Sequence, residues 1–176
     1  MKLAYVRSDQ SGQVNRKLSE AAQNLIQRGV RVVGTIQIDT PRANSHKCDM
    51  DVRVLPDGNM FRISQNLGPN ARGCHLDTDA LEQAVVATMA RLDGADLLII
   101  NKFGKREAEG SGFRSAIEQA LEAGIPVVVA VNAANIDAWN SFTGGLDVRL
   151  PPDRKTITAW CVEPDQHQDI HAAAIV

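Results

Sequence analysis

A chain of 176 residues with 44% hydrophobic residues can bury a sizeable core, and its length fits one domain better than two. Its formal net charge of −2, with both signs mixed along the chain, excludes the basic field that nucleic acids and anionic lipids select. Small molecules or proteins are the expected partners. Neither a signal-peptide pattern nor a run of roughly 20 apolar residues is present, so we expect a cytoplasmic protein without membrane insertion.

The first part of the chain predicts a strand, a helix and a second strand. Residues 2–6 read as a short strand, and residues 30–38 are rich in β-branched side chains. Between these runs, apolar residues recur at the spacing of one helical face, which consists of Leu18, Ala21, Ala22, Leu25 and Ile26. Two short runs at 50–55 and 60–64 then flank a strong turn sequence at 56–59. We expect an inserted β-hairpin at about residues 48–66.

The rest of the chain alternates between helical faces and apolar strands. Asp77 or Thr78 is the expected N-cap of a second helix. We predict further helices over 113–121 and 136–142, buried strands at 97–100 and 125–131, and edge strands at 148–150 and 156–162. The fold class is therefore α/β, a three-layer, mostly parallel sheet with helices on both faces. It forms a single domain over residues 1–163, followed by a polar tail at 164–176.

The loop between the first strand and the first helix occupies the position of a phosphate-binding loop. Such a loop needs glycines, a lysine and a hydroxyl. Aligning Ser8 with the first glycine of the pattern places Gln13, Val14 and Asn15 where glycine, lysine and serine or threonine belong. The loop is either an anion-binding remnant, using the amides of a helix N-terminus, or an ordinary capped turn. Its candidate ligand-binding residues are Ser8, Asp9, Gln10, Ser11, Gly12, Gln13 and Asn15.

A second candidate site follows the apolar strand at 97–100, because ligands bind at the carboxyl ends of parallel strands. The segment from Asn101 to Glu107 resembles the acidic-strand region of a small P-loop nucleoside-triphosphatase family first described in thermophiles. Gly104, Lys105 and Glu107 match that pattern, whereas Asn101 and Lys102 replace an acidic pair. The resemblance implies a P-loop NTPase-like fold. The replaced acids would hold magnesium and activate water, so hydrolysis by that route is not expected.

A closer resemblance covers nearly the whole chain. It is carried by an ordered set of motifs at 48–50, 63–69, 73–77, 101–105 and 138–139. This set is similar to a bacterial family of unknown function whose genes tend to lie in or near molybdate-transport operons. The resemblance implies a role in molybdenum or tungsten metabolism, with molybdate-transport or molybdenum-cofactor proteins as partners, and identifies no catalytic residue.

Molybdate is a doubly charged oxyanion, so its site needs several amide or hydroxyl donors in a dry concavity. Besides the first loop, the loop before the second helix could contribute such donors through Gly68, Arg72 and Gly73. Lys102 and Lys105 could clamp a phosphate or oxyanion. We expect Glu107 to pair with one of these lysines and fix the turn. The ligand is either molybdate or tungstate, or a nucleotide with magnesium.

The remaining reactive side chains favour structural roles. A tetrahedral soft-metal site would need the chain to bring together His46, Cys48, Cys74 and His75, whose spacing is unlike that of common zinc knuckles. A buried thiol is more often a small apolar group. Cys161 is expected to pack in the edge strand at 156–162. Trp139 and Phe142 are expected to close one end of the sheet.

Three functional classes remain open from the sequence. In the class that we favour, the chain is a small-ligand binding protein built on a degenerate nucleotide-binding fold. Alternatively, it is an active nucleoside-triphosphatase or kinase that uses residues such as Arg16 and Lys105. In the third class it is an interaction partner of a molybdate transporter or cofactor-maturation enzyme, with the hairpin as docking surface. The sequence leaves the oligomeric state open, a homo-oligomer included.

Overall fold

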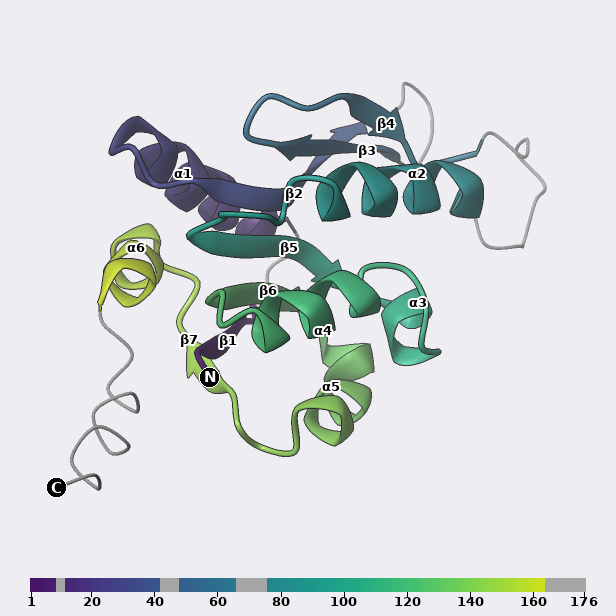
Figure 1. The fold of residues 1–176 in the computed structure, drawn as a ribbon. Coiled ribbons are helices and arrows are strands. Elements are labelled where there is room, and N and C mark those ends of the chain that lie inside the picture. Colours follow the sequence, from purple (N-terminus) through teal and green to yellow (C-terminus); the bar gives the residue numbers. More distant parts are fainter. Residues whose placement is uncertain (9–11, 42–47, 66–75, 164–176) are drawn as a thin grey trace, which may run out of the picture.

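A computed structural model describes residues 1–8, 12–41, 48–65 and 76–163 of the chain (Figure 1). The predicted polar tail at 164–176 lies outside the described residues. The strands are β1 (Leu3–Val6), β2 (Val32–Pro41), β3 (Cys48–Leu55), β4 (Met60–Arg62), β5 (Leu97–Phe103), β6 (Val127–Val131) and β7 (Val148–Leu150). The helices are α1 (Gln13–Gln27), α2 (Thr78–Met89), α3 (Lys105–Ala108), α4 (Arg114–Glu122), the 3-10 helix η1 (Ala133–Asn135), α5 (Ile136–Thr143) and α6 (Arg154–Val162).

The described strands form one sheet in the order β4-β3-β2-β5-β6-β1-β7. β2, β5, β6, β1 and β7 are parallel, and their central members are apolar along nearly their whole length because helices cover both faces. The predicted α/β architecture with a mostly parallel sheet is confirmed. β5 runs on past the predicted strand end to Phe103, so Asn101 and Lys102 belong to the strand.

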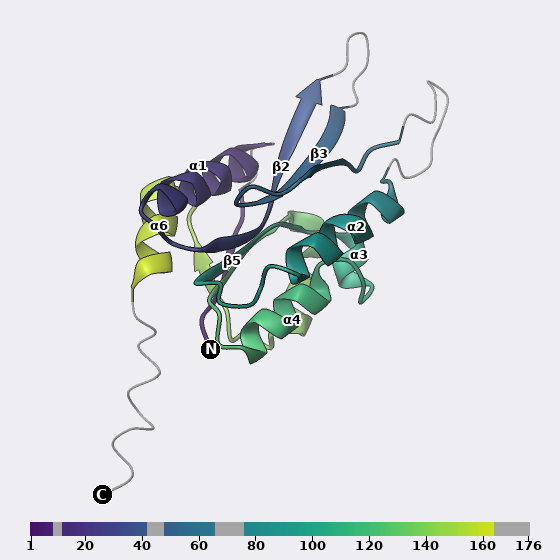
Figure 2. The same ribbon diagram turned by 45° about the horizontal axis from the view of Figure 1, so that its top comes forward.

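Helices lie on both faces of the sheet, as the alternating pattern predicts. Figure 2 shows α1 and α6 on one side and α2, α3 and α4 on the other. One core joins α1 and Ile157 of α6 to side chains such as Ile99 and Val128. The opposite core contains α2, α4 and the fully buried Trp139 of α5. The predicted packing role of Trp139 is confirmed, since it contacts Phe103 edge to face with ring centroids 5.1 Å apart.

The predicted hairpin is present as the antiparallel pair β3 and β4. β2 pairs with β5 only from Val32 to Thr35, whereas it pairs with β3 from Gly34 to Pro41. The carboxyl-terminal half of β2 therefore pairs only with the hairpin and no longer with β5. As a result, β2 and β5 separate at their carboxyl ends. Both cavities described below open at this separation.

The segment 156–162 is a correction to the sequence analysis, because it forms helix α6 instead of an edge strand. Its residues favour a strand by intrinsic propensity, but Asp153 caps a helix by accepting from the Thr156 amide at 2.9 Å. Ile157 then packs fully buried against α1. Cys161 belongs to this helix and packs against the same core, and burial raises the pKa of its thiol to about 12. The other predicted edge strand is confirmed as β7, which pairs with β1.

None of the helices in the described part of the chain is long and apolar enough to cross a membrane.

Candidate functional site

A polar cavity of about 300 Å³ lies where β1, β2, β5 and β6 end and α1 begins. This is the expected ligand position in an open parallel sheet. Its described lining residues are Ser8, Gly12, Val14, Asn15, Gln37, Asp39, Lys102, Ala130, Val131 and Asn132. The structure therefore brings Ser8, Gly12, Asn15 and Lys102, all predicted to bind ligand, to one place.

Helix α1 begins at this cavity. Its N-cap residue Gly12 has φ 72°, a conformation that suits glycine, and no side chain in the described part of the chain caps the first turn. The amides of a first turn have no partners within the helix and carry the positive end of the helix dipole. The Ser8 hydroxyl donates to the side-chain oxygen of Gln13, which closes the loop. Asp9, Gln10 and Ser11 lie outside the described residues.

Asp39 is a site residue that the sequence analysis missed. It lies on β2, and its carboxylate accepts from Asn15 Nδ2 at 2.9 Å and from Gln37 Nε2 at 2.7 Å. Asp39 is the single acidic residue among the described residues that line the polar cavity. One carboxylate does not make a metal site, but Mg²⁺ commonly binds through one or two carboxylates together with ligand phosphates. No sequence motif identifies Asp39 as a site residue, because it comes close to α1 only through the way in which β2 is placed in the sheet.

The two residues that replace the acidic pair lie near the carboxyl end of strand β5. Asn101 is buried, with 4% of its surface exposed, and neither its Nδ2 nor its Oδ1 has a hydrogen-bond partner in the described part of the chain. Leaving both atoms unpaired is costly, because each loses its bonds to water. Lys102 has φ 150° beside a shift in the β5–β6 register, a backbone conformation that disfavours lysine. Unpaired and strained groups at a strand end are typical of ligand sites.

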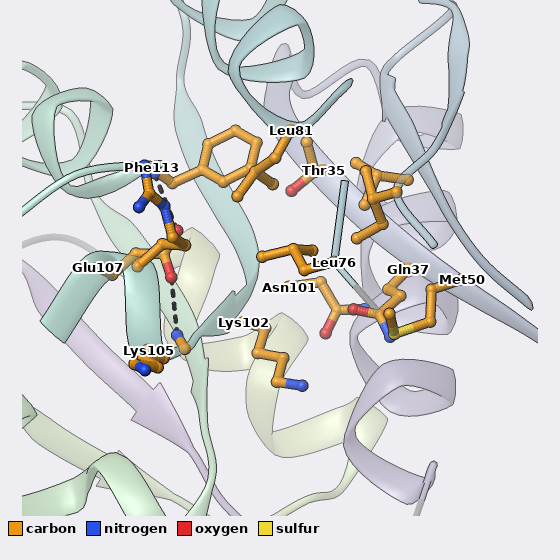
Figure 3. A pocket seen from close by; sticks show the side chains of 14 residues that line it. Thr35, Gln37, Met50, Leu76, Leu81, Asn101, Lys102, Lys105, Glu107 and Phe113 are labelled. Atoms are coloured by element: carbon orange, nitrogen blue, oxygen red, sulfur yellow. Dashed lines mark hydrogen bonds between the residues drawn. The ribbon is translucent and has the colours of Figure 1, made fainter. Parts of the chain in front are cut away.

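Glu107 fixes the turn that follows β5, as predicted, but not through a lysine. Its carboxylate is buried and accepts from the backbone amides of Gly104 at 2.8 Å and Phe113 at 3.0 Å. Figure 3 shows both hydrogen bonds. The expected pairing with Lys102 or Lys105 is wrong, because Lys105 points to the surface and lies 3.6 Å from Glu109 instead. The side chain of Lys105 is 82% exposed, so it is poorly placed to hold an anion inside the cavity.

A second cavity of about 230 Å³ adjoins the polar one, and Gln37 and Lys102 line both. It lies between the hairpin, α2, α3 and the end of β5. Its exposed lining surface is mostly apolar, although half of the residues that line it are polar or charged: Thr35, Gln37, Met50, Val52, Ile63, Leu76, Leu81, Asn101, Lys102, Gly104, Lys105, Arg106, Glu107 and Phe113. The Asn101 side chain extends toward Gln37 and Met50 and away from Glu107 (Figure 3).

Several sequence candidates fall outside the described residues. These are Gly68, Arg72 and Gly73 of the second loop, and His46, Cys74 and His75 of the suggested metal site. Cys48, the fourth residue of that suggested site, is exposed at the start of β3. Within the described ranges, no group of three or more His, Cys, Asp or Glu residues could hold a metal ion.

Comparison with known proteins gives a family match over residues 3–160, to the family described as "Protein of unknown function (DUF2478)". The chain belongs to this family. The resemblance to a family of unknown function seen in the sequence is thereby confirmed. A relative is the "Molybdenum import ATP-binding protein ModC 2" of Bradyrhizobium diazoefficiens, 38% identical over 144 residues. That match covers 81% of this chain but only 16% of the relative's length, so the chain is similar to a small part of it.

Three further proteins to which this chain is similar are named as nucleoside triphosphatases. The nucleoside-triphosphatase THEP1 of Methanosarcina acetivorans is 25% identical over 117 residues, which cover 65% of this chain and 67% of the relative. THEP1 from Aquifex aeolicus superposes with a TM-score of 0.61 at 13% identity, covering 88% and 91% of the two chains. A human cancer-related nucleoside triphosphatase gives a TM-score of 0.60 at 18% identity, covering 86% and 88%. The DUF2478 chain therefore has a P-loop NTPase-like fold.

Proposed function

We propose that this protein binds a small anionic ligand, a phosphorylated compound or an oxyanion, in the polar cavity, and that it serves molybdenum or tungsten metabolism. The observation that carries the proposal is Lys102, a strained lysine at the end of β5 that lines the cavity opposite the start of α1. A lysine ammonium and helix amides are the groups that hold phosphates and oxyanions.

The composition of the cavity favours binding over hydrolysis. The two acidic positions at the end of β5 hold Asn101 and Lys102, and Asp39 is the single acid among the described lining residues. The position of the phosphate-loop lysine holds Val14. A nucleotide would therefore meet donors for its phosphates but few groups that could position magnesium and water.

Support for molybdenum comes from one relative. The Molybdenum import ATP-binding protein ModC 2 of Bradyrhizobium diazoefficiens contains a segment 38% identical to this chain. We infer that the segment contributes a ligand-binding unit to molybdenum handling in that longer protein, and that this chain performs the same task.

A thermal-shift panel tests the proposal with molybdate, tungstate, sulfate, ATP and GTP, each with and without magnesium. A ligand at 100 times its dissociation constant adds about 2.7 kcal/mol to the stability of the native state, which is a readily measured shift. Lys102→Ala should abolish the shift, whereas Lys155→Ala, which removes an exposed lysine of α6, should leave it unchanged. An unchanged melt with every compound contradicts the proposal.

The two alternative functions predict other results in the same experiments. An active nucleoside-triphosphatase or kinase would release or transfer phosphate from ATP or GTP in the presence of magnesium. The P-loop NTPase-like fold is the observation in its favour. A pure interaction partner would show no shift with any compound, and it would form a stable complex through the hairpin.

A further inference from the structure

We propose that the second cavity, beside the polar one, recognises a planar nitrogen heterocycle of the purine or pterin kind, with Asn101 reading its hydrogen-bonding edge. This inference rests on the proposed function, since the anionic part of the same ligand would occupy the polar cavity. The inference specifies that the anionic group belongs to a compound with a purine-like or pterin-like ring.

The first observation is the state of the Asn101 side chain. Only 4% of its surface is exposed, and it lines the second cavity. Its Nδ2 and Oδ1 atoms both lack a hydrogen-bond partner in the part of the chain that the structure describes. Buried polar groups in proteins are nearly always hydrogen-bonded. An unpaired donor and acceptor on one side chain indicate that a ligand supplies the missing partners.

The chemistry of the amide specifies the ligand's edge. An asparagine side chain presents one acceptor and one donor side by side, so it pairs bidentately with a group that presents a donor next to an acceptor. The amino and ring nitrogens of adenine form such an edge, as asparagine contacts to DNA illustrate. The N–H and carbonyl of guanine or a pterin form another. A simple oxyanion such as molybdate has acceptors only and would leave the Asn101 Oδ1 unpaired.

The walls of the cavity match the faces of a flat ring. Most of the exposed wall surface is apolar and comes from side chains such as Met50, Val52, Leu81 and Phe113, while polar and charged side chains supply the rest. Such a lining favours an apolar surface over a hydrated ion. The buried Nε of Arg106, which has no partner among the described residues, belongs to the same lining and is a further donor for a ring carbonyl.

The two cavities together fit a ring joined to an anion. Gln37 and Lys102 line both of them, so the two cavities meet at these side chains of β2 and β5. Their volumes of about 230 and about 300 Å³ bring the combined space into the range of small-molecule sites, about 300–1,000 Å³. The heterocycle would lie beside Asn101 and the phosphate beside Lys102.

Isothermal titration calorimetry on the full chain tests the proposal with AMP, GMP and 6-hydroxymethylpterin phosphate. Ribose 5-phosphate, which has the phosphate but no heterocycle, and purine riboside 5′-monophosphate, which lacks the exocyclic group, are the control ligands. We expect AMP, GMP or the pterin to bind at least about tenfold tighter than ribose 5-phosphate, because two buried hydrogen bonds are gained. The purine riboside compound should lose most of that advantage. A preference for the pterin or for one purine identifies the ring.

Two variants connect the preference to Asn101. Asn101→Leu should remove the roughly tenfold advantage of the ring while ribose 5-phosphate binds as before. It should also melt higher than the natural chain, because it replaces an unpaired polar group with an apolar one of similar size. Thr158→Val is the matched control, since the buried Thr158 hydroxyl on α6 is also unpaired among the described residues but lines neither cavity. It should raise the melting temperature and leave binding unchanged.

The results separate this inference from the proposed function. Equal affinity for ribose 5-phosphate and every ring-containing compound would overturn the role of Asn101 while leaving anion binding intact. A ring preference that survives in Asn101→Leu would also overturn it. If ribose 5-phosphate and the ring compounds all fail to bind, and the oxyanion and nucleotide panel fails too, then both proposals are wrong.

Discussion

Asn15 on α1 donates its side-chain amide to Asp39 on β2, with 2.9 Å between Nδ2 and Oδ2. The contact joins the helix that begins at the polar cavity to the strand that carries the hairpin. It also holds a carboxylate beside the groups that we propose for anion binding. We therefore expect Asp39 to influence how magnesium affects anion binding in that cavity.

Replacing Asp39 with asparagine should change this dependence. The variant keeps the size of the side chain but removes a negative charge that repels a bound anion. We expect Asp39→Asn to bind ATP more tightly than the natural chain without magnesium and to gain less when magnesium is added. Calorimetric titrations with ATP, with magnesium or with EDTA, measure both effects. Identical magnesium responses in the two proteins would show that Asp39 does not contact the metal.

Removing the Glu107 carboxylate should destabilise the turn after β5. Glu107→Ala leaves the amides of Gly104 and Phe113 without their buried acceptor. We expect a loss of about 2–3 kcal/mol, or roughly 4–12 °C in melting temperature for a domain of this size. Thermal unfolding followed by circular dichroism gives the value. Glu109→Ala, which removes an exposed carboxylate of the same turn, should change the melting temperature little.

Among the glycines that the structure describes, Gly34 has the least room for a side chain. A Cβ there would lie 1.9 Å from the carbonyl oxygen of Ile99 on the neighbouring strand, and Gly34 has φ 120°. We expect Gly34→Ala to prevent folding, seen as insoluble expression or the loss of a cooperative thermal transition. Gly29→Ala separates the two causes, because Gly29 has φ 85° with open space around it. That control should lose only about 1 kcal/mol from the backbone conformation. A folded, stable Gly34→Ala variant would contradict the close strand approach.

The cysteines should differ in reactivity. Burial raises the pKa of the Cys161 thiol to about 12, so very little of it is in the reactive thiolate form at pH 8. Cys48 is exposed on β3. Brief maleimide labelling at pH 8 followed by peptide mass mapping should modify Cys48 and spare Cys161 until the chain is unfolded. Equal labelling of both in the native protein would contradict the packing of α6.

Much of the fold could be predicted because its signals are local. The apolar runs that became β5 and β6, the Asp77 cap of α2 and the turn at 56–59 each specify their element through neighbouring residues. The segment 156–162 could not be predicted in this way. Its β-branched residues favour a strand, and the Asp153 cap and the packing of Ile157 on α1 outweigh that preference.

The candidate site was predictable only in part. The change from acids to Asn101 and Lys102 is visible in the sequence and marks the correct strand end. The isolation of the Asn101 amide, the backbone of Lys102 and the approach of Asp39 depend on strand register and chain direction, which no local motif encodes. The surface position of Lys105 is likewise a result of the α3 turn.

β2 stops pairing with β5 at Thr35 but continues beside β3 to Pro41. The space for a ligand thus comes from the divergence of β2 and β5 and not from small side chains. A ligand bound between these strands would replace the hydrogen bonds that β2 and β5 no longer make to each other. It would thereby make the hairpin more rigid where it joins the sheet.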